Sequence, residues 1–364
     1  MNILRITTLF VPPWKGLGPG PYELSKAQAG LGDNVTVYTR SITGNGDSIE
    51  CICDRYTVIR LSSISDLDFS LKVFLRTWKD IKNKEYDIIH SHGYSALFNL
   101  LFTRSIPIVS HAHISRNGQL RDNSYGLQGG WLERLKFLKS ALFERIYLRL
   151  SSHIFAVSSD VKNEIARIST VSVTVVHNGY NPNVFFPTSD NREIDILFVG
   201  GLNSRKGEDI LVDALAALGN KFKTCVIVGE GPNRANLELK INEISNPQRV
   251  SLLANINNEE LSSIMRKSKC LVLLSKSEGL PKVLVESAAC GVVPILSDIP
   301  THIEFLGENL SKRLCIRRDK NDLIGKLNEI QMNWNELNQE ILVRVERYNW
   351  RHIAQEIRKI YVEL

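Results

Sequence analysis

Several features are missing from this 364-residue sequence. It has no apolar run of the ~18 residues needed to span a bilayer, and no small-residue cleavage site follows its first segment, 1–8. That segment therefore predicts a strand rather than a signal peptide. The cysteines are scattered except for Cys51 and Cys53, so zinc and redox spacings are also missing. Such cysteines usually act as small buried hydrophobes, and we expect a reducing, cytoplasmic compartment.

A large charge of one sign is also absent. The chain has 45 Lys+Arg against 39 Asp+Glu, a net charge of +6. This favours anionic ligands or an anionic membrane surface, but it is too small and too dispersed to indicate nucleic acid. A composition of 43% hydrophobic and 23% charged residues excludes intrinsic disorder and fibrous order. At roughly 150 residues per domain, the length predicts about two folded domains.

Short β-branched runs alternate with longer runs of helical period, which is typical of a parallel sheet with crossover helices. A first series of strands is predicted at 2–8, 34–39, 57–61, 86–91, 107–111, 153–157 and 172–177. A second series is predicted at 194–199, 223–228, 249–253, 270–274 and 293–296. The βα series thus occurs twice along the chain.

The fold class we expect is α/β, with two doubly wound Rossmann-like domains facing each other across a cleft. The predicted parts are a first domain at 1–178, a linker at 179–192, a second domain at 193–345, and a C-terminal helical segment at 346–364 that can pack back on the first domain. In such sheets ligands bind outside the carboxyl ends of the strands, so the loops there are the place to seek chemistry.

The most informative loop follows the strand predicted at 270–274. It places Glu278 at the carboxyl end of that strand, and Glu286 follows eight residues later, just over two turns on if a helix begins near Pro281. Two such carboxylates can accept hydrogen bonds from vicinal hydroxyls, while N–H groups at a helix start attract phosphate. A polyol phosphate fits this pattern. A solvated loop glutamate followed by a helix-surface glutamate fits the spacing equally well.

The run 278–294 resembles the E-x7-E signature of the retaining glycosyltransferases of family 4 (GT4), which have the GT-B fold. Other segments agree with that family in order along the chain. FVGGLNSRKG at 198–207 is similar to its VGRLxxxKG element, VGEGP at 228–232 to its VGxGP turn, and VHNGY at 176–180 to its PNG linker. The resemblance covers nearly the whole chain and is strongest over 196–300.

This resemblance implies a role for each matching residue. Glu286 would hold the ribose of a nucleotide sugar, Glu278 would bond hydroxyls of the transferred sugar, and Lys206 would bind the diphosphate. Gly229 of the VGxGP turn would belong to the same donor site. Cations beside the departing diphosphate matter most, because negative charge develops there in the transition state.

The sequence departs from the family pattern at two positions. Gly201 stands where the family usually has Arg, so one phosphate-binding cation is missing, and Arg205 is the candidate to replace it. Pro281 replaces a frequent Gly and has no N–H to donate. The backbone amides of Gly279 and Leu280 remain as the donors of this loop.

The glycine-rich loop after the first strand resembles the family loop that approaches the donor phosphates and the acceptor. Gly16 and Gly18 are its candidate donor-binding residues, with Gly20 as an alternate; a plain surface loop is the other interpretation. The loop fails the G-x-G-x-x-G pattern because Pro21 holds the last position. Arg40 ends the second strand where a dehydrogenase has an acid, which argues against a Rossmann dehydrogenase.

Four histidines end two neighbouring strands. The family often has a histidine near the reacting carbon at the end of the strand predicted at 107–111, which makes His113 the first catalytic candidate and His111 the second. His90 and His92 end the preceding strand. No set of them has compelling metal spacing, and the resemblance implies an enzyme that needs no metal or other cofactor, since protein cations and helix dipoles supply the charge.

The segment 131–150 is amphipathic and carries five basic residues against two acids. It can lie on anionic lipid, or it can pack its apolar face on the sheet as an ordinary domain helix. The two interpretations are compatible if only the basic face of the helix contacts the membrane.

The resulting prediction is a retaining glycosyltransferase that moves a sugar from a nucleotide-diphosphate donor, held mainly on the second domain, to a hydroxyl of a saccharide or lipid-linked saccharide. Surface polysaccharide or glycoconjugate assembly at the cytoplasmic face of a membrane is the expected setting. The alternatives are a nucleotide-sugar epimerase or hydrolase on the same fold, and a non-catalytic nucleotide-sugar-binding homologue. A glycosidase using Glu278 and Glu286 is disfavoured, because nothing places the two carboxylates on either side of one bond.

Overall fold

The computed structural model describes residues 1–11, 18–41, 46–121, 131–188, 191–254 and 256–364. The chain divides into two compact units. Unit 1 comprises Met1–His177 together with Trp350–Leu364, and unit 2 comprises Asn178–Asn349. Residues 179–192, which the sequence indicates as a linker, are grouped with unit 2.

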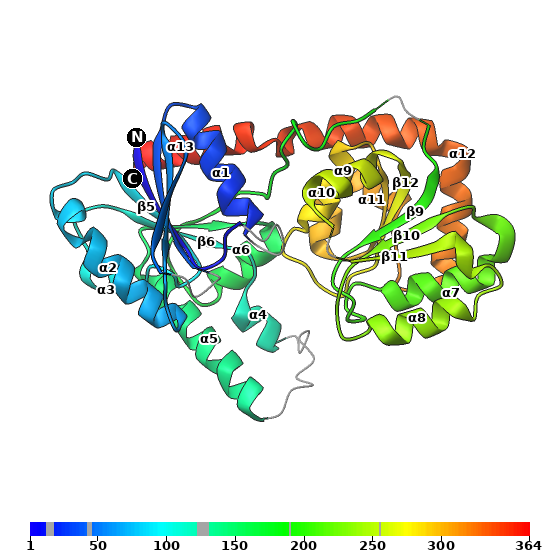
Figure 1. Cartoon of the computed structure of the whole chain (residues 1–364), viewed down its shortest axis with the longest axis horizontal. Helices are drawn as coiled ribbons and strands as arrows, with labels where there is room; N and C mark the ends of the chain where they lie inside the picture. The colour runs from blue at the N-terminus through cyan, green and yellow to red at the C-terminus, as the bar shows by residue number, and fades with distance from the viewer. Residues whose placement is uncertain (12–17, 42–45, 122–130, 189–190, 255) are drawn as a thin grey trace. The chain divides into compact units, whose positions relative to one another are not determined.

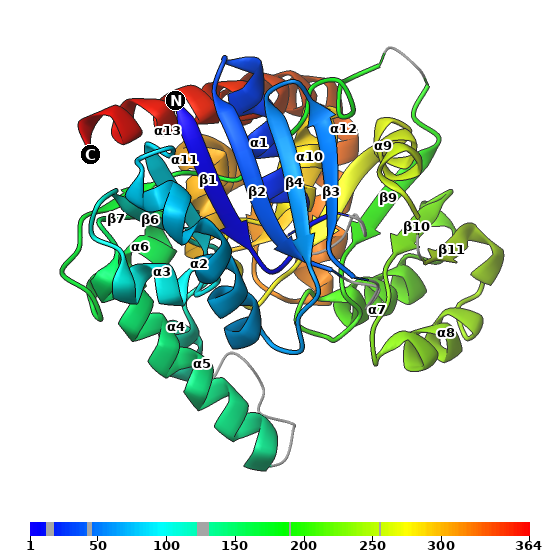
Figure 2. The same cartoon turned by 60° about the vertical axis from the view of Figure 1, so that its left-hand side comes forward.

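Unit 1 is built on an eight-stranded sheet with the order β3-β4-β2-β1-β5-β6-β7-β8. All neighbouring strands pair in parallel except β3 and β4, and Figure 2 shows β1, β2, β4 and β3 side by side. The strands are β1 (Asn2–Thr7), β2 (Asn34–Arg40), β3 (Ser48–Cys53), β4 (Tyr56–Leu61), β5 (Ile88–His92), β6 (Ile108–Ala112), β7 (His153–Ala156) and β8 (Val173–Val175). After its first residue, β1 is buried throughout.

The helices of unit 1 include the last helix of the chain, α13 (Trp350–Glu363). It packs on α1 (Pro19–Gly30), as Figure 1 shows, and its Trp350, Ile353 and Ile357 join the buried core of the unit. The remaining helices are α2 (Asp66–Lys82), α3 (Leu97–Phe102), α4 (Arg116–Arg121), α5 (Trp131–Leu150) and α6 (Ser159–Ala166). The first unit is therefore completed by residues from the far end of the sequence.

Unit 2 has an all-parallel sheet of six strands in the order β11-β10-β9-β12-β13-β14. These are β9 (Ile194–Val199), β10 (Cys225–Val228), β11 (Val250–Leu253), β12 (Ser268–Leu273), β13 (Val293–Ser297) and β14 (Cys315–Ile316). The helices are α7 (Glu208–Leu218), α8 (Arg234–Asn242), α9 (Asn258–Arg266), α10 (Lys282–Ala289), α11 (Pro300–Leu314) and α12 (Lys320–Val345), with short 3-10 turns at Gly219–Lys221, Pro247–Arg249 and Glu346–Tyr348. The order reverses between β9 and β12, which puts the loops after these two strands at the switch point where doubly wound sheets bind ligands.

Every strand predicted from the sequence is present, with its ends within two residues of the prediction. The sequence missed β3 and β14. Within the described ranges, no helix combines the length and apolar character needed to cross a membrane.

Candidate active site

The switch point of unit 2 is shaped by glycines that permit close backbone packing. Gly207 follows β9 with φ of +84° and caps α7, and a Cβ there would lie 2.7 Å from the Cβ and the carbonyl oxygen of Leu274. A Cβ on Gly229 would lie 2.0 Å from the carbonyl oxygen of Gly200. The predicted donor-site residue Gly229 thus lets the loops after β9 and β10 touch, which sets the path of the loop that carries Arg205 and Lys206.

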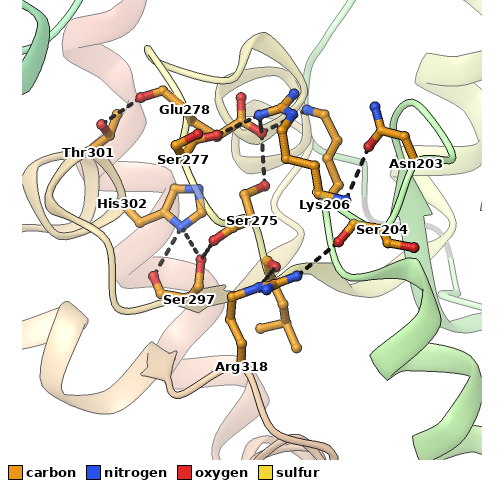
Figure 3. A network of polar contacts seen from close by, with 12 residues as sticks. Asn203, Ser204, Lys206, Ser275, Ser277, Glu278, Ser297, Thr301, His302 and Arg318 are labelled. Atoms are coloured by element: carbon orange, nitrogen blue, oxygen red, sulfur yellow. Dashed lines mark hydrogen bonds and ion pairs between the residues drawn. The ribbon is translucent and has the colours of Figure 1, made fainter. Parts of the chain in front are cut away.

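Glu278 is the centre of the polar network at this point (Figure 3). Its Oε1 accepts a hydrogen bond from Ser275 Oγ at 2.8 Å and lies 2.9 Å from Lys206 Nζ and 3.4 Å from Arg205 NH1. Arg205 NH1 also donates to the Ser277 carbonyl at 2.5 Å. Three residues that the sequence nominated for donor binding therefore form one cluster.

The charges of this cluster keep Glu278 ionised. Burial leaves its side chain only 9% exposed and by itself would raise the pKa of the carboxyl. The adjacent Lys206 and Arg205 outweigh that effect and hold the pKa below its ordinary value. The site therefore presents one carboxylate, which can accept hydrogen bonds from hydroxyls, and two cations, which can bind phosphate oxygens.

Residues that sequence reasoning missed support the Glu278 loop. Thr301 Oγ1 donates to the Glu278 carbonyl at 3.0 Å, and Ser297 Oγ donates to the Ser275 carbonyl at 2.6 Å. Arg318 links the loop after β12 to the loop after β9. Its Nε donates to the Leu274 carbonyl at 2.6 Å, and its NH2 donates to the Ser204 carbonyl at 3.1 Å (Figure 3). His302 lies six residues after the strand predicted at 293–296, and Arg318 follows β14, which the sequence did not predict, so neither had a clear signal.

His302 completes this support from the first turn of α11. Its Nδ1 lies 3.0 Å from the Ser297 carbonyl, which can only accept, so Nδ1 carries the proton. Burial lowers the pKa of His302 to about 4, so the ring is neutral. Its buried Nε2 has no hydrogen-bond partner among the described residues and is left as an acceptor.

Glu286 lies on α10 and is buried, but it stands apart from the Glu278 cluster. Its Oε1 lies 3.6 Å from Lys282 Nζ. Pro281 occupies the N-cap with ψ of 121°, and the helix begins at Lys282, near Pro281 as the sequence indicated. The loop is anchored by Asn178, whose Nδ2 donates to the Leu280 carbonyl at 2.8 Å, and both Gly279 and Leu280 are buried.

Gly201 has room for a side chain. A Cβ at this position would meet Asn203 Nδ2 at 3.8 Å and the Glu230 carbonyl oxygen at 3.9 Å, which are ordinary contacts. The absence of the family arginine is therefore not imposed by packing, and Arg205 is already directed at Glu278.

In unit 1 the four histidines lie together: His90 and His92 are in β5, His111 is in β6, and His113 directly follows β6. His92 Nδ1 and His113 Nε2 are 3.0 Å apart, and His90 Nε2 and His111 Nδ1 are 3.2 Å apart. His92, His111 and His113 line a cavity of about 230 Å³. The two histidines nominated for catalysis thus share one cavity wall.

The glycine loop is described only in part. Gly16 lies outside the described residues. Gly18 precedes α1, and a Cβ there would lie 2.8 Å from the backbone C and O of Phe10, so only glycine fits. Gly20 lies inside α1 with open space around it, and no contact gives it a role.

The amphipathic segment forms α5. Ala141, Glu144, Tyr147 and Leu148 are buried on one side. Large apolar side chains along another side stay exposed at a spacing of three and four residues, namely Trp131, Leu135, Leu138 and Leu142. The helix therefore packs in unit 1 and also presents an apolar stripe.

Solved structures show the fold of this chain. Sucrose-phosphate synthase from Thermosynechococcus elongatus superposes with a TM-score of 0.82 over 100% of this chain and 98% of that one, at 20% identity. The Anabaena protein HepE, solved in complex with UDP and glucose, superposes with a TM-score of 0.71 over 100% of both chains, at 16% identity. The fold is the GT-B fold of glycosyltransferases.

Two family models match adjoining parts of the sequence. "Glycosyltransferase Family 4" matches residues 14–184, and "Glycosyl transferases group 1" matches residues 182–342. The chain belongs to this family of glycosyltransferases, and it is an enzyme of the glycosyl-transferring class.

Characterised and uncharacterised relatives carry the same activity in their names. An uncharacterized glycosyltransferase of Methanocaldococcus jannaschii is 28% identical over 78% of this chain and 77% of its own length. One component of the human phosphatidylinositol N-acetylglucosaminyltransferase is 26% identical over 99% of this chain and 75% of its own. The GDP-mannose:cellobiosyl-diphosphopolyprenol alpha-mannosyltransferase of Xanthomonas oryzae is 23% identical over 74% and 72%.

Proposed function

We propose that this glycosyltransferase moves a sugar from a nucleoside-diphosphate sugar to a hydroxyl of a saccharide or lipid-linked saccharide, with retention of anomeric configuration. The observation that carries the proposal is the ionised Glu278 beside Lys206 and Arg205 at the switch point of unit 2. Relatives act on GDP-mannose with a diphosphopolyprenol acceptor, and on phosphatidylinositol, by their names. The chemistry of the cluster matches such a donor.

In this proposal the cations stabilise the leaving diphosphate. Lys206 and Arg205 both contact Glu278, and part of their positive charge would pair with the diphosphate when the donor binds. Negative charge grows on the leaving phosphate as the glycosidic bond breaks, so preorganised cations lower the barrier more than they strengthen ground-state binding. No metal is required, because the protein supplies the positive charge.

Glu278 then accepts hydrogen bonds from hydroxyls of the transferred sugar, and Glu286 holds the ribose. Among the described residues none stands out as a covalent nucleophile, and the Glu278 carboxylate is already engaged by Ser275, Lys206 and Arg205. We therefore infer a front-face displacement in which the leaving phosphate assists the incoming hydroxyl. His113 helps to organise the reacting face from unit 1, the acceptor side.

Donor screening followed by product analysis tests this function. Thermal shift against UDP-, GDP-, ADP- and dTDP-sugars, with and without EDTA, is expected to identify one stabilising donor and no effect of EDTA. Incubation of that donor with candidate lipid-linked acceptors should give an α-linked product from an α-linked donor. Release of free sugar or an epimer with no acceptor product would instead indicate a hydrolase or an epimerase.

We also infer that α5 holds the enzyme at the cytoplasmic face of an anionic membrane. The stripe of Leu135, Leu138 and Leu142 is 46% to 58% exposed, and Arg134, Lys139, Arg145 and Arg149 accompany it on the same helix. An apolar stripe flanked by basic side chains binds by insertion and by attraction to anionic lipid together. A lipid-linked acceptor would be met at that surface.

Vesicle sedimentation tests the membrane contact. The protein is expected to bind vesicles containing phosphatidylglycerol, to bind phosphatidylcholine vesicles weakly, and to be released by salt. Leu138→Ser with Leu142→Ser should reduce binding several-fold. The control is Val343→Ser with Val362→Ser, which alters apolar side chains on α12 and α13 that are more exposed than Leu138 and Leu142. Equal binding by both double variants would exclude α5 as the contact.

A further inference from the structure

Four histidines of unit 1, namely His90, His92, His111 and His113, form a two-by-two array of imidazoles. Rings adjacent along each strand stack, with centroids 4.8 Å apart for His90 and His92 and for His111 and His113. Across the strands the rings meet edge to edge through the two N···N contacts given above. Three of the four, His90, His92 and His111, are buried, and this burial lowers their pKa well below the ordinary value, so they are neutral.

A buried arginine touches this array. Arg5 lies in the middle of β1, directly opposite His90 in the register with β5, and its side chain is fully buried. Its NH1 donates to Ser25 Oγ at 2.5 Å, and its NH2 donates to Gln28 Oε1 at 2.7 Å and lies 3.3 Å from His90 Nδ1. No carboxylate of the described residues lies within ion-pair distance of Arg5.

Arg5 fixes the position of the proton on His90. A guanidinium can only donate, so the Nδ1 that faces it must be an acceptor. The Tyr361 hydroxyl, which contacts the same nitrogen, is a phenol whose pKa burial raises further, so it too has a proton to donate. Neutral His90 therefore carries its proton on Nε2.

The same reasoning passes to the next ring. His90 Nε2–H points at His111 Nδ1, which must accept, so neutral His111 carries its own proton on Nε2. His111 Nε2 is buried and has no hydrogen-bond partner in the described parts of the chain. His111 also lines the cavity of about 230 Å³. A donor is thus left unused beside an open space, which is costly unless a ligand accepts from it.

A metal ion is the other occupant that three neutral imidazoles suggest, since one nitrogen from each of His90, His92 and His111 lies within 4.8 Å of the others. The charge of Arg5 argues against it. A divalent cation beside an unpaired buried guanidinium would meet strong repulsion at low dielectric. The edge-to-edge contact also aims the His90 and His111 nitrogens at each other rather than at a shared point.

We propose that Arg5 and His90 are positioning residues that lock the proton of His111 on Nε2, so that His111 offers a hydrogen-bond donor to an oxygen of the ligand in this cavity. That ligand would be a hydroxyl- or phosphate-bearing sugar substrate, a part of the inference that rests on the proposed function. The proton placement does not depend on it. His111 would then donate a hydrogen bond to an oxygen atom of the ligand and could not act as a base through Nε2.

Two-bond ¹H–¹⁵N correlation spectra of the full ¹⁵N-labelled chain test the proton placement, because they distinguish the two neutral tautomers of histidine. His90 and His111 are both expected in the Nε2–H form. His90→Asn removes the donor that faces His111 and should let His111 move its proton to Nδ1. His90→Gln keeps an amide donor at that reach and should preserve the wild-type form, as should His92→Asn, the matched control on the neighbouring ring.

An Nδ1–H signal for His111 in the wild-type chain would overturn the proposal, whatever the variants do. One equivalent of Zn²⁺ is expected to leave the His90 and His111 signals unchanged, and a stoichiometric shift of both would overturn it in favour of a metal centre. For the ligand, His111→Gln keeps a donor near the Nε2 position and should retain about 10-fold more transfer activity than His111→Asn. Equal losses of activity in the two variants would show that His111 does not act as a hydrogen-bond donor to the ligand. A wild-type chain that transfers no sugar would contradict the proposed function, while the spectra would still decide the proton placement.

Discussion

The two units gather polar side chains at the carboxyl ends of their strands in opposite ways. In unit 2, Glu278 is ionised and is matched by Lys206 and Arg205 at the switch point. In unit 1, His90, His92 and His111 are neutral, the four rings of the histidine array contact one another in pairs, and Arg5 is the buried charge that contacts His90. One site is organised by charge pairing, and the other by the placement of protons.

The two kinds of site respond differently to pH and to charged ligands. Ion pairs bind and release charged groups, as departure of a diphosphate requires, and they are disrupted when a carboxylate is protonated. Neutral imidazoles give directional hydrogen bonds, and they resist protonation chiefly because burial makes charge costly, with the positive charge of Arg5 adding to that effect. The two units should therefore fail at different pH and through different substitutions.

The largest expected effect is the loss of unit 1 in mild acid. His90, His92 and His111 have lowered pKa values in the folded chain, so the unfolded chain binds more protons as the pH falls below 6.5, and stability falls with it. Each contributes a slope of ~1.4 kcal/mol per pH unit, and together about 4. Unit 2 has His302 in this window, and Glu278 weakens only below its ordinary pKa of 4.5.

Hydrogen exchange read by mass spectrometry from pH 7 to pH 5 follows the two units separately. Peptides of β1, β5 and β6 should lose protection before those of β9 and β12. His92→Asn should make the acid sensitivity of unit 1 shallower by about one third. Simultaneous loss of protection in both units would break the comparison.

Next in size is Glu278→Gln, which keeps the shape of the site and removes its negative charge. We expect a loss of transfer of about 10²–10³-fold, as for other preorganised polar groups at a reacting centre. Steady-state kinetics with the donor identified by screening measures this. Glu308→Gln breaks an exposed ion pair with Lys312 and serves as the control, with activity close to wild type. Full activity of Glu278→Gln would show that the paired charges of unit 2 are not needed for transfer.

Gly207→Ala probes the backbone that holds the cations. The φ of +84° and the 2.7 Å approach to Leu274 predict destabilisation of about 1–3 kcal/mol in urea unfolding. Gly325→Ala is the control, since Gly325 lies in α12 with nothing within 4 Å, and Ala there should stabilise by about 0.5–1 kcal/mol. The two substitutions should therefore have opposite signs. A neutral Gly207→Ala would show that this turn tolerates a side chain.

The smallest effect concerns Arg205 and the missing family arginine. Arg205→Ala should lower kcat/KM about 10-fold, because it removes one of two cations from the leaving diphosphate. Gly201→Arg has room to fit and should recover much of that loss in the double variant. Recovery would show that the two positions supply the same charge, whereas an additive loss would contradict it.

The sequence predicted the parallel strands of both units because buried β-branched runs leave a clear local signal. It missed β3, whose residues are mostly exposed at a sheet edge, and β14, which is two residues long. Neither segment has a hydrophobic run that distinguishes a strand from a loop.

For the candidate site, the spacing of the motifs was enough to identify Lys206, Arg205 and Glu278 from the sequence alone. Their mutual contacts could not be predicted, because they depend on how the loops after β9 and β12 pack through Gly207. His302 was missed for the same reason. In unit 1 the sequence named all four histidines but not Arg5, although a charged residue in the middle of an apolar strand was a visible signal.

The packing of α13 on α1 has a consequence for how the enzyme is made. Tyr361, which contacts His90, and the Trp350, Ile353 and Ile357 side chains of the unit 1 core all follow unit 2 in the chain. Unit 2 is therefore synthesised before the core of unit 1 is complete, so it can fold first. Unit 1 cannot complete its core until α13 has been synthesised.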